Sequence, residues 1–266
     1  MSLRKWSKMN RISLVNNKLD TSINDIKVEY IKASNIFDIS NLNIDTLDNC
    51  DLYLELDLDN DKLNINFNIS YDTNLYLYIK GSKAKIKFNY NVDSTIKILK
   101  YNSIDNINEM IEVNLNQVNS SINYTFKSIG TVKENYDYVI HHNKPYTISN
   151  ITNNCVNKEG SINIQISGYV PKNVIGCICN QNNRIINLTN NKCEIRPNLY
   201  IDTDDVDANH SALIGRFSKD EMFYLNSRGI NEVDANNLLI KGFLLSNVFN
   251  EELESSIKKD IDNNWR

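Results

Sequence analysis

The sequence predicts a mainly β protein that ends in a segment of α-helices. Apolar and polar residues alternate with a period of two through most of the 266-residue chain, and Asn- and Asp-rich turns interrupt this alternation at regular intervals. After residue 217 the spacing of apolar residues becomes helical. Short strands that follow one another without intervening helices indicate an all-β core. We therefore expect an N-terminal arm with the first strands over residues 1–50, a β core over 51–216 and a helical segment over 217–266.

The clearest strand pattern begins at Leu52. Apolar residues occupy every second position up to the turn Asp59-Asn60-Asp61, and the alternation resumes on both sides of Gly81-Ser82-Lys83. Six side chains are predicted to point into the core: Leu54, Leu56, Ile65, Phe67, Ile86 and Phe88. A sandwich, a barrel and a β-helix all produce this pattern, so the alternation leaves the architecture open.

Capping residues mark the C-terminal helices. Ser218 and Glu221 match the S-x-x-E capping box, and Gly229 lies where a glycine commonly ends a helix. We predict helices over residues 218–228 and 232–249, with a third, polar helix to follow.

Composition argues against several classes of function. A formal net charge of −4 disfavours nucleic acid or an anionic membrane surface as the main partner. No apolar run approaches the roughly 20 residues needed to span a bilayer, and the N-terminus lacks the apolar stretch of a secretory signal. We therefore expect a cytoplasmic protein without membrane insertion.

The chain has five cysteines, which are Cys50, Cys155, Cys177, Cys179 and Cys193. An odd count in a reducing compartment argues against a disulfide framework. Cys177 and Cys179 share one face of a strand, about 7 Å apart, which suits two soft metal ligands or two small side chains in a narrow core. The motifs G-x-S-x-G, G-x-G-x-x-G and the phosphate-binding G-x-x-x-x-G-K are missing from the sequence. We therefore expect neither enzymatic activity nor ATP binding by this chain itself.

Several short motifs follow one another in a specific order near the C-terminus. They are Asp204-Asp205-Val206, His210-Ser211-Ala212 with Gly215, Phe223-Tyr224-Leu225, and Ser227-Arg228-Gly229-Ile230. Their order and spacing resemble the C-terminal core of the SufB/SufD family, the scaffold subunits of the SUF iron–sulfur cluster assembly machinery. The resemblance covers about residues 135–250, and the sequence looks closer to SufD than to SufB.

This resemblance implies a right-handed parallel β-helix core over 51–216, followed by the helical segment. Subunits of the family pair edge to edge, and each holds a SufC-type ATPase through its C-terminal helices. The implied partners are a SufC-type ATPase and either a SufB-like paralogue or a second copy of this chain. The residues expected to bind these partners are Asp220, Phe223, Tyr224, Arg228, Gly229 and Phe243.

The resemblance also implies a site for iron–sulfur chemistry. His210 matches the family histidine that faces the partner subunit, and Cys193 lies close to a cysteine that SufB-like subunits supply. Ala208 stands where family members commonly have a cysteine, so the remaining ligands are expected from Cys193 or from the partner chain. The implied cluster is transient, and none is expected to be bound tightly by this chain alone.

We therefore interpret the chain as a non-enzymatic scaffold subunit for iron–sulfur cluster assembly. The first alternative is an interaction module that docks on the ATPase without binding a cluster. The second alternative, a β-helix carbohydrate-active enzyme, is disfavoured by the missing export signal and by the lack of a recognisable carboxylate or arginine constellation.

Overall fold

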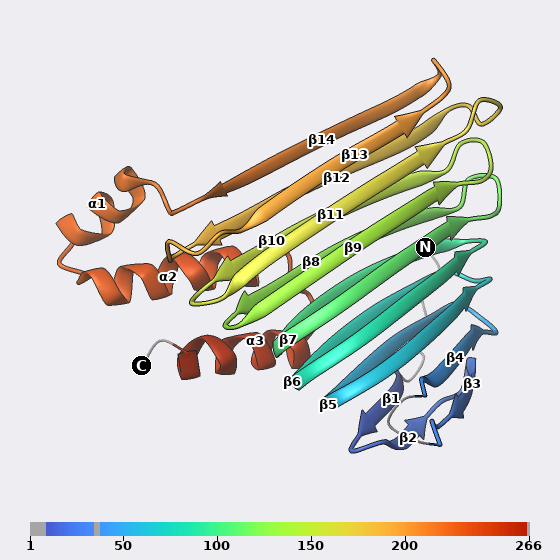
Figure 1. The fold of residues 1–266 in the computed structure, drawn as a ribbon, viewed down its shortest axis with the longest axis horizontal. Coiled ribbons are helices and arrows are strands. Elements are labelled where there is room, and N and C mark those ends of the chain that lie inside the picture. The colour runs from blue at the N-terminus through green and yellow to red at the C-terminus, as the bar shows by residue number, and fades with distance from the viewer. Residues whose placement is uncertain (1–8, 35–37, 265–266) are drawn as a thin grey trace, which may run out of the picture.

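The computed structural model describes residues 9–34 and 38–264, so part of the expected N-terminal arm lies outside the described residues. Within the described ranges, fourteen strands precede three helices (Figure 1). The strands are β1 (Asn10–Val15), β2 (Lys18–Ser22), β3 (Ile26–Ile31), β4 (Ser40–Thr46), β5 (Cys50–Ile69), β6 (Thr73–Val92), β7 (Thr95–Leu115), β8 (Ser121–Gly130), β9 (Lys133–His142), β10 (Ile148–Asn157), β11 (Ser161–Val170), β12 (Cys177–Asn187), β13 (Glu194–Ile201) and β14 (Val206–Gly215). The helices are α1 (Lys219–Ser227), α2 (Glu232–Leu245) and α3 (Glu251–Asn264).

The strands form a parallel β-solenoid of about 7 turns. Each of the long strands β5, β6 and β7 contributes its first half to one face of the coil and its second half to the other, and each pairs in parallel with the next. Face A consists of β1, the first halves of β5–β7, and then β8, β10, β12 and β14. Face B consists of β4, the second halves of β5–β7, and then β9, β11 and β13. The predicted parallel β-helix with a C-terminal helical segment is confirmed.

Apolar side chains fill the interior of the coil. All six side chains predicted to point inward are buried, with at most 1% exposure. Paired residues of parallel strands face the same way, so each apolar residue packs on the same position of the next coil. Phe67, for example, stacks on Tyr90 with ring centroids 4.9 Å apart. Burial of these rows from water is the main force that holds the coils together.

Asparagine ladders join neighbouring coils on the outer surface. The side-chain amide of Asn89 donates to Asn66, which in turn donates to Asn43, at 2.6 and 2.8 Å. Aspartates on the outer surface can accept such hydrogen bonds in place of an asparagine, since the side-chain amide of Asn74 donates to Asp51 at 2.7 Å. Many of the numerous asparagines therefore lie within strands rather than in turns.

The two ends of the solenoid differ. At the N-terminal end β1 pairs antiparallel with β2, and β3 pairs antiparallel with β4, so two hairpins flank the first coil. At the other end β13 pairs only with β11, and β14 pairs only with β12 (Figure 1). Among the described residues, both strands keep one edge whose backbone N–H and C=O groups have no neighbouring strand. We call this the open end.

The helices confirm the capping signals and correct one boundary. Ser218 and Glu221 form the reciprocal capping box at the start of α1, and Gly229 follows the helix with φ +83°. α2 ends at Leu245 rather than at 249, because Ser246 adopts an extended ψ of 130° and Asn247 has a positive φ of 58°. Within the described ranges, no helix has the length and apolar character needed to cross a lipid bilayer.

Candidate functional site

His210 lies on the last strand of face A, at the open end. The parallel register places it beside Gln181 of β12, and it places Ala208 beside Cys179. Gln181 and Cys179 point into the interior and are buried, so their neighbours on β14 also point toward the interior. No further coil in the described part of the chain covers them, and His210 is exposed. The imidazole is therefore available to a group that approaches the open end.

The middle of β13, the other strand of the open end, lies at the same level of the coil as His210. Gln181 crosses the interior, and its side-chain amide donates to the backbone oxygen of Asn198 on β13 at 3.2 Å. Since Gln181 is the register neighbour of His210, the middle of β13 and the middle of β14 face each other. The side-chain oxygen of Gln181 is buried and accepts no hydrogen bond from the described residues.

Cys193 does not lie beside His210. It immediately precedes β13, five residues before Asn198, and a strand of five residues spans about 16 Å. Its half-buried side chain packs against the apolar core, and burial raises the pKa of its thiol. Across the part of the chain that the structure describes, no group of three His, Cys, Asp or Glu side chains is arranged to hold a metal ion. One chain thus offers His210 and Cys193 as separate single ligands.

Cys177 and Cys179 are core residues, each 1% exposed. Cys177 neighbours Thr147 and Cys179 neighbours Ser149, and the ring nitrogens of His142 contact these two hydroxyls at 2.8 and 2.9 Å. Thr147 in turn contacts the Cys177 sulfur at 3.3 Å. Burial lowers the pKa of His142 to about 4, so the ring is neutral near pH 7. Of the two interpretations of this cysteine pair, the geometry favours small side chains in a polar part of the core.

Helix α1 projects from the body of the protein without a buried residue. Phe223 is 75% exposed and Tyr224 is 57% exposed, and the guanidinium of Arg228 lies over the Tyr224 ring at 5.2 Å. Phe243 differs from these residues because it packs on Phe217 within the cluster that joins α2 and α3 to face A. Two exposed aromatic side chains of this segment therefore lie on α1, and a third, Phe249, lies between α2 and α3.

Comparison with known proteins assigns the chain to a family. Residues 82–243 match the family described as the SUF system FeS cluster assembly, SufBD core domain. This match covers more than half of the chain and includes the open end, α1 and most of α2. The chain belongs to the SufBD family.

Individual relatives match over shorter stretches. An iron–sulfur cluster assembly SufBD family protein of Mycobacterium leprae is 48% identical over 63 residues, which are 23% of this chain and 16% of the relative. The iron–sulfur cluster assembly protein SufD of Bacillus subtilis is 39% identical over 82 residues, 30% of this chain and 18% of the relative. SufD of Escherichia coli is 44% identical over 50 residues, 19% of this chain and 12% of the relative. The matched stretches thus span less than a fifth of each relative.

This SufBD chain also holds a buried polar cluster that the sequence pattern did not reveal. Lys100 and Glu109 form an ion pair inside the coil, and both are 0% exposed. The hydroxyl of Ser128 donates to Glu134 at 2.7 Å, and burial raises the pKa of Glu134 to about 7. Burial also lowers the pKa of Lys100, although Glu109 opposes this effect. One carboxylate oxygen of Glu109 and one of Glu134 have no hydrogen-bond partner among the described residues.

Proposed function

We propose that this SufBD chain is a non-enzymatic scaffold subunit of iron–sulfur cluster assembly that acts with a SufC-type ATPase and a second SufBD subunit. The match over residues 82–243 supports a part in iron–sulfur cluster assembly, and the open end with its exposed histidine supports the role of a scaffold subunit. An uncovered pair of strand edges on a soluble protein favours the addition of further strands. The open end is the single observation on which the proposal depends.

The sequence of β14 suits an antiparallel neighbour related by a two-fold axis. An axis through His210 sets Val206 opposite Ile214, Ala208 opposite Ala212, and the two histidines next to each other. All of these residues share the inward-facing side of the strand. Shifting the axis by one residue in either direction breaks this match, because His210 then lies opposite an alanine.

The same axis suits the edge of face B. The middle of β13 lies level with His210, as the contact between Gln181 and Asn198 indicates. An axis at Asn198 sets Ile195 opposite Ile201. Both edges can therefore be extended by one partner, which is either a second copy of this chain or a SufB-like paralogue. Pairing of identical patches is the usual arrangement of two-fold dimers.

We further propose that a transient iron–sulfur cluster is assembled at this junction, with His210 as one ligand. A neutral imidazole is a competent iron ligand, and single ligands from two chains can combine at an interface. Ala208 contributes no thiol, so a paralogue that carries a cysteine there completes the site more readily than a second copy does. Cys193 lies too far along β13 to share one metal ion with His210 of the same chain.

The test of this site is His210→Ala in the purified complex with its ATPase and partner subunit. Asn209→Ala is the matched control, because it changes the neighbouring outward residue of the same strand. We expect both variants to assemble, and we expect the His210 variant to hold much less iron and sulfide after reconstitution. Equal iron and sulfide in wild type and His210→Ala would favour the second candidate, a module that docks on the ATPase without a cluster.

The ATPase is proposed to bind α1. A helix without buried residues and with two exposed aromatic rings offers an apolar surface to a partner. Phe223→Ser is expected to weaken ATPase binding at least tenfold in calorimetry. Phe249→Ser is the matched control, because Phe249 is 86% exposed but precedes α3 rather than lying on α1. Unchanged affinity in the Phe223 variant would refute this docking site.

A further inference from the structure

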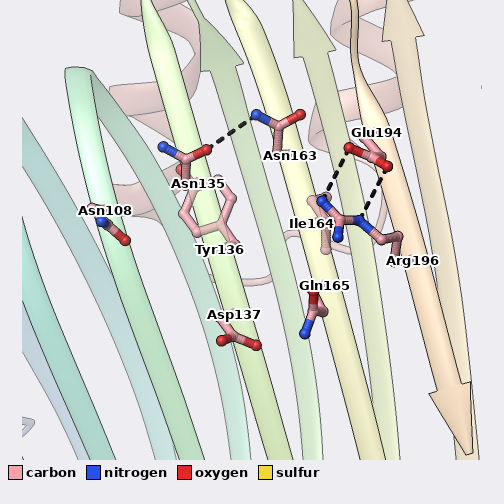
Figure 2. A pocket seen from close by; sticks show the side chains of 9 residues that line it. All are labelled: Asn108, Asn135, Tyr136, Asp137, Asn163, Ile164, Gln165, Glu194 and Arg196. Carbon is pink, nitrogen blue, oxygen red and sulfur yellow. Dashed lines mark hydrogen bonds and ion pairs between the residues drawn. The ribbon is translucent and has the colours of Figure 1, made fainter.

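Face B carries a polar hollow of about 160 Å³ next to the open end (Figure 2). It spans four neighbouring strands and two adjacent rows of outward side chains. One row consists of Asn108, Asn135, Asn163 and Glu194, and the other includes Asp137, Gln165 and Arg196. The hollow lies on the opposite face from α2 and α3, and it plays no part in the function proposed above.

Most polar groups around the hollow already have partners. Both oxygens of Glu194 are engaged by Arg196, at 3.1 Å each. Asn163 donates its side-chain amide to Asn135 at 3.1 Å. The positive charge of Arg196 is thus neutralised within the rim, as the dashed lines in Figure 2 show.

Asp137 has no such partner among the described residues. One of its carboxylate oxygens is shielded from water and accepts no hydrogen bond from the described residues. Elsewhere on the outer surface an asparagine of the next coil donates to such a carboxylate, as Asn74 does to Asp51. At this position the neighbour on the next coil is Gln165, which makes no hydrogen bond to the shielded oxygen, and the neighbour on the preceding coil is Met110, which has no donor. The carboxylate of Asp137 therefore lines the hollow, and its shielded oxygen has no donor among the described residues.

We propose that this hollow binds a guanidinium or alkylammonium group. Asp137 supplies the charge, while Gln165 and Asn108 supply amide oxygens on either side. The net charge of the three ionisable lining groups, Asp137, Glu194 and Arg196, is −1, which favours a cation over an anion or a neutral sugar. A shallow volume of this size accepts one side-chain head group rather than a whole nucleotide or oligosaccharide. Two sources share this chemistry, namely a lysine or arginine of a subunit docked at the neighbouring edge and a free small cation.

Met110 provides the reporter for the experiment. It is next to Asp137 in the register, and the chain has only 4 methionines, so methyl-labelled methionine gives a simple spectrum even in a large complex. Methylguanidinium is titrated into the full chain at constant ionic strength, with tetramethylammonium as a cation that has no N–H donor. We expect the Met110 methyl signal to shift saturably with methylguanidinium only.

The variants decide the assignment. Asp137→Asn is expected to weaken the response at least tenfold, whereas Asp93→Asn, an exposed carboxylate elsewhere on the surface, is expected to leave it unchanged. An equal response in Asp137→Asn, an equal response to tetramethylammonium, or no saturable shift in wild type would each overturn the proposal.

The titration is then repeated in the assembled complex with its other subunits. Loss of the Met110 response there identifies a basic side chain of a neighbouring subunit as the occupant. A response that persists identifies a free cation. The first titration uses the isolated chain, so its outcome does not depend on iron loading or on ATPase binding.

Discussion

Replacing Glu134 by glutamine tests whether the solenoid interior holds a proton near neutral pH. Burial raises the pKa of this carboxyl from 4.5 to about 7, and the hydrogen bond from Ser128 only partly opposes the effect. The folded state therefore binds more protons than the unfolded state between these two pH values. Through this group the free energy of unfolding is highest below pH 4.5, falls as the pH rises toward 7, and stays reduced above 7.

The difference between the two pKa values corresponds to about 3 kcal/mol above pH 7. Glutamine has nearly the same shape and no charge, and its side-chain oxygen can keep the hydrogen bond from Ser128. We expect Glu134→Gln to be more stable than wild type by up to about 3 kcal/mol at pH 8, and to match it within about 0.5 kcal/mol at pH 4.5. Urea unfolding followed by circular dichroism at several pH values measures both.

The control is Glu112→Gln, since Glu112 lies on the neighbouring strand β7 but points outward and pairs with half-exposed Lys87 at 2.8 Å. This surface variant is expected to change stability by less than about 1 kcal/mol at either pH. The reasoning about Glu134 is refuted if its variant is less stable than wild type at pH 8, or if the difference between the two proteins does not vary with pH.

Two further predictions concern the joint between helices and solenoid and the corner of the long strands. Lys127→Met removes the 2.7 Å hydrogen bond that the ammonium donates to the backbone oxygen of Ser246 at the end of α2. We expect the free energy of local opening of α2 to fall by about 1–2 kcal/mol, so that its amide protons exchange with solvent about tenfold faster. Unchanged exchange would contradict this anchoring role. Gly81→Ala should destabilise the protein by about 3 kcal/mol in urea unfolding, because Gly81 has φ +129° and an added methyl group overlaps the Leu58 carbonyl. Gly242→Ala, with open space around it, should leave stability equal or slightly raised.

Period-two alternation was enough to predict which side chains fill the coil in β5 and β6. It is not decisive at Lys100, where apolar Leu99 and Tyr101 on either side favour an outward lysine. In the structure the lysine points inward, because helices cover the outer face at this point and bury both apolar neighbours. Sequence reasoning had no means of knowing that the outer face is covered, so the interior ion pair was missed.

The candidate site was predicted in part. The resemblance selected His210 as the residue facing a partner, and its exposure at an uncovered edge agrees with that hypothesis. It also suggested that Cys193 contributes a nearby ligand, whereas the coil places this residue far along the opposite edge. Proximity between residues on different faces depends on the geometry of the corners and on the length of each coil. The coil length grows from 23 residues at Cys50–Thr73 to 30 residues at Ile148–Ile178. These lengths are not encoded in any local motif.

The unequal ends of the solenoid give its unfolding a direction. Each coil contacts only the coils before and after it, so the free energy of unfolding is approximately a sum of contributions from single coils and from contacts between neighbouring coils. The hairpins β1–β2 and β3–β4 terminate the stack at one end, and Arg11 ties β1 to Glu252 of α3. At the other end the last coil has a neighbour on one side alone, so fraying should start at β13 and β14. A subunit docked there, as proposed above, would complete the stack, and the lifetime of the folded chain would then depend on the supply of that partner.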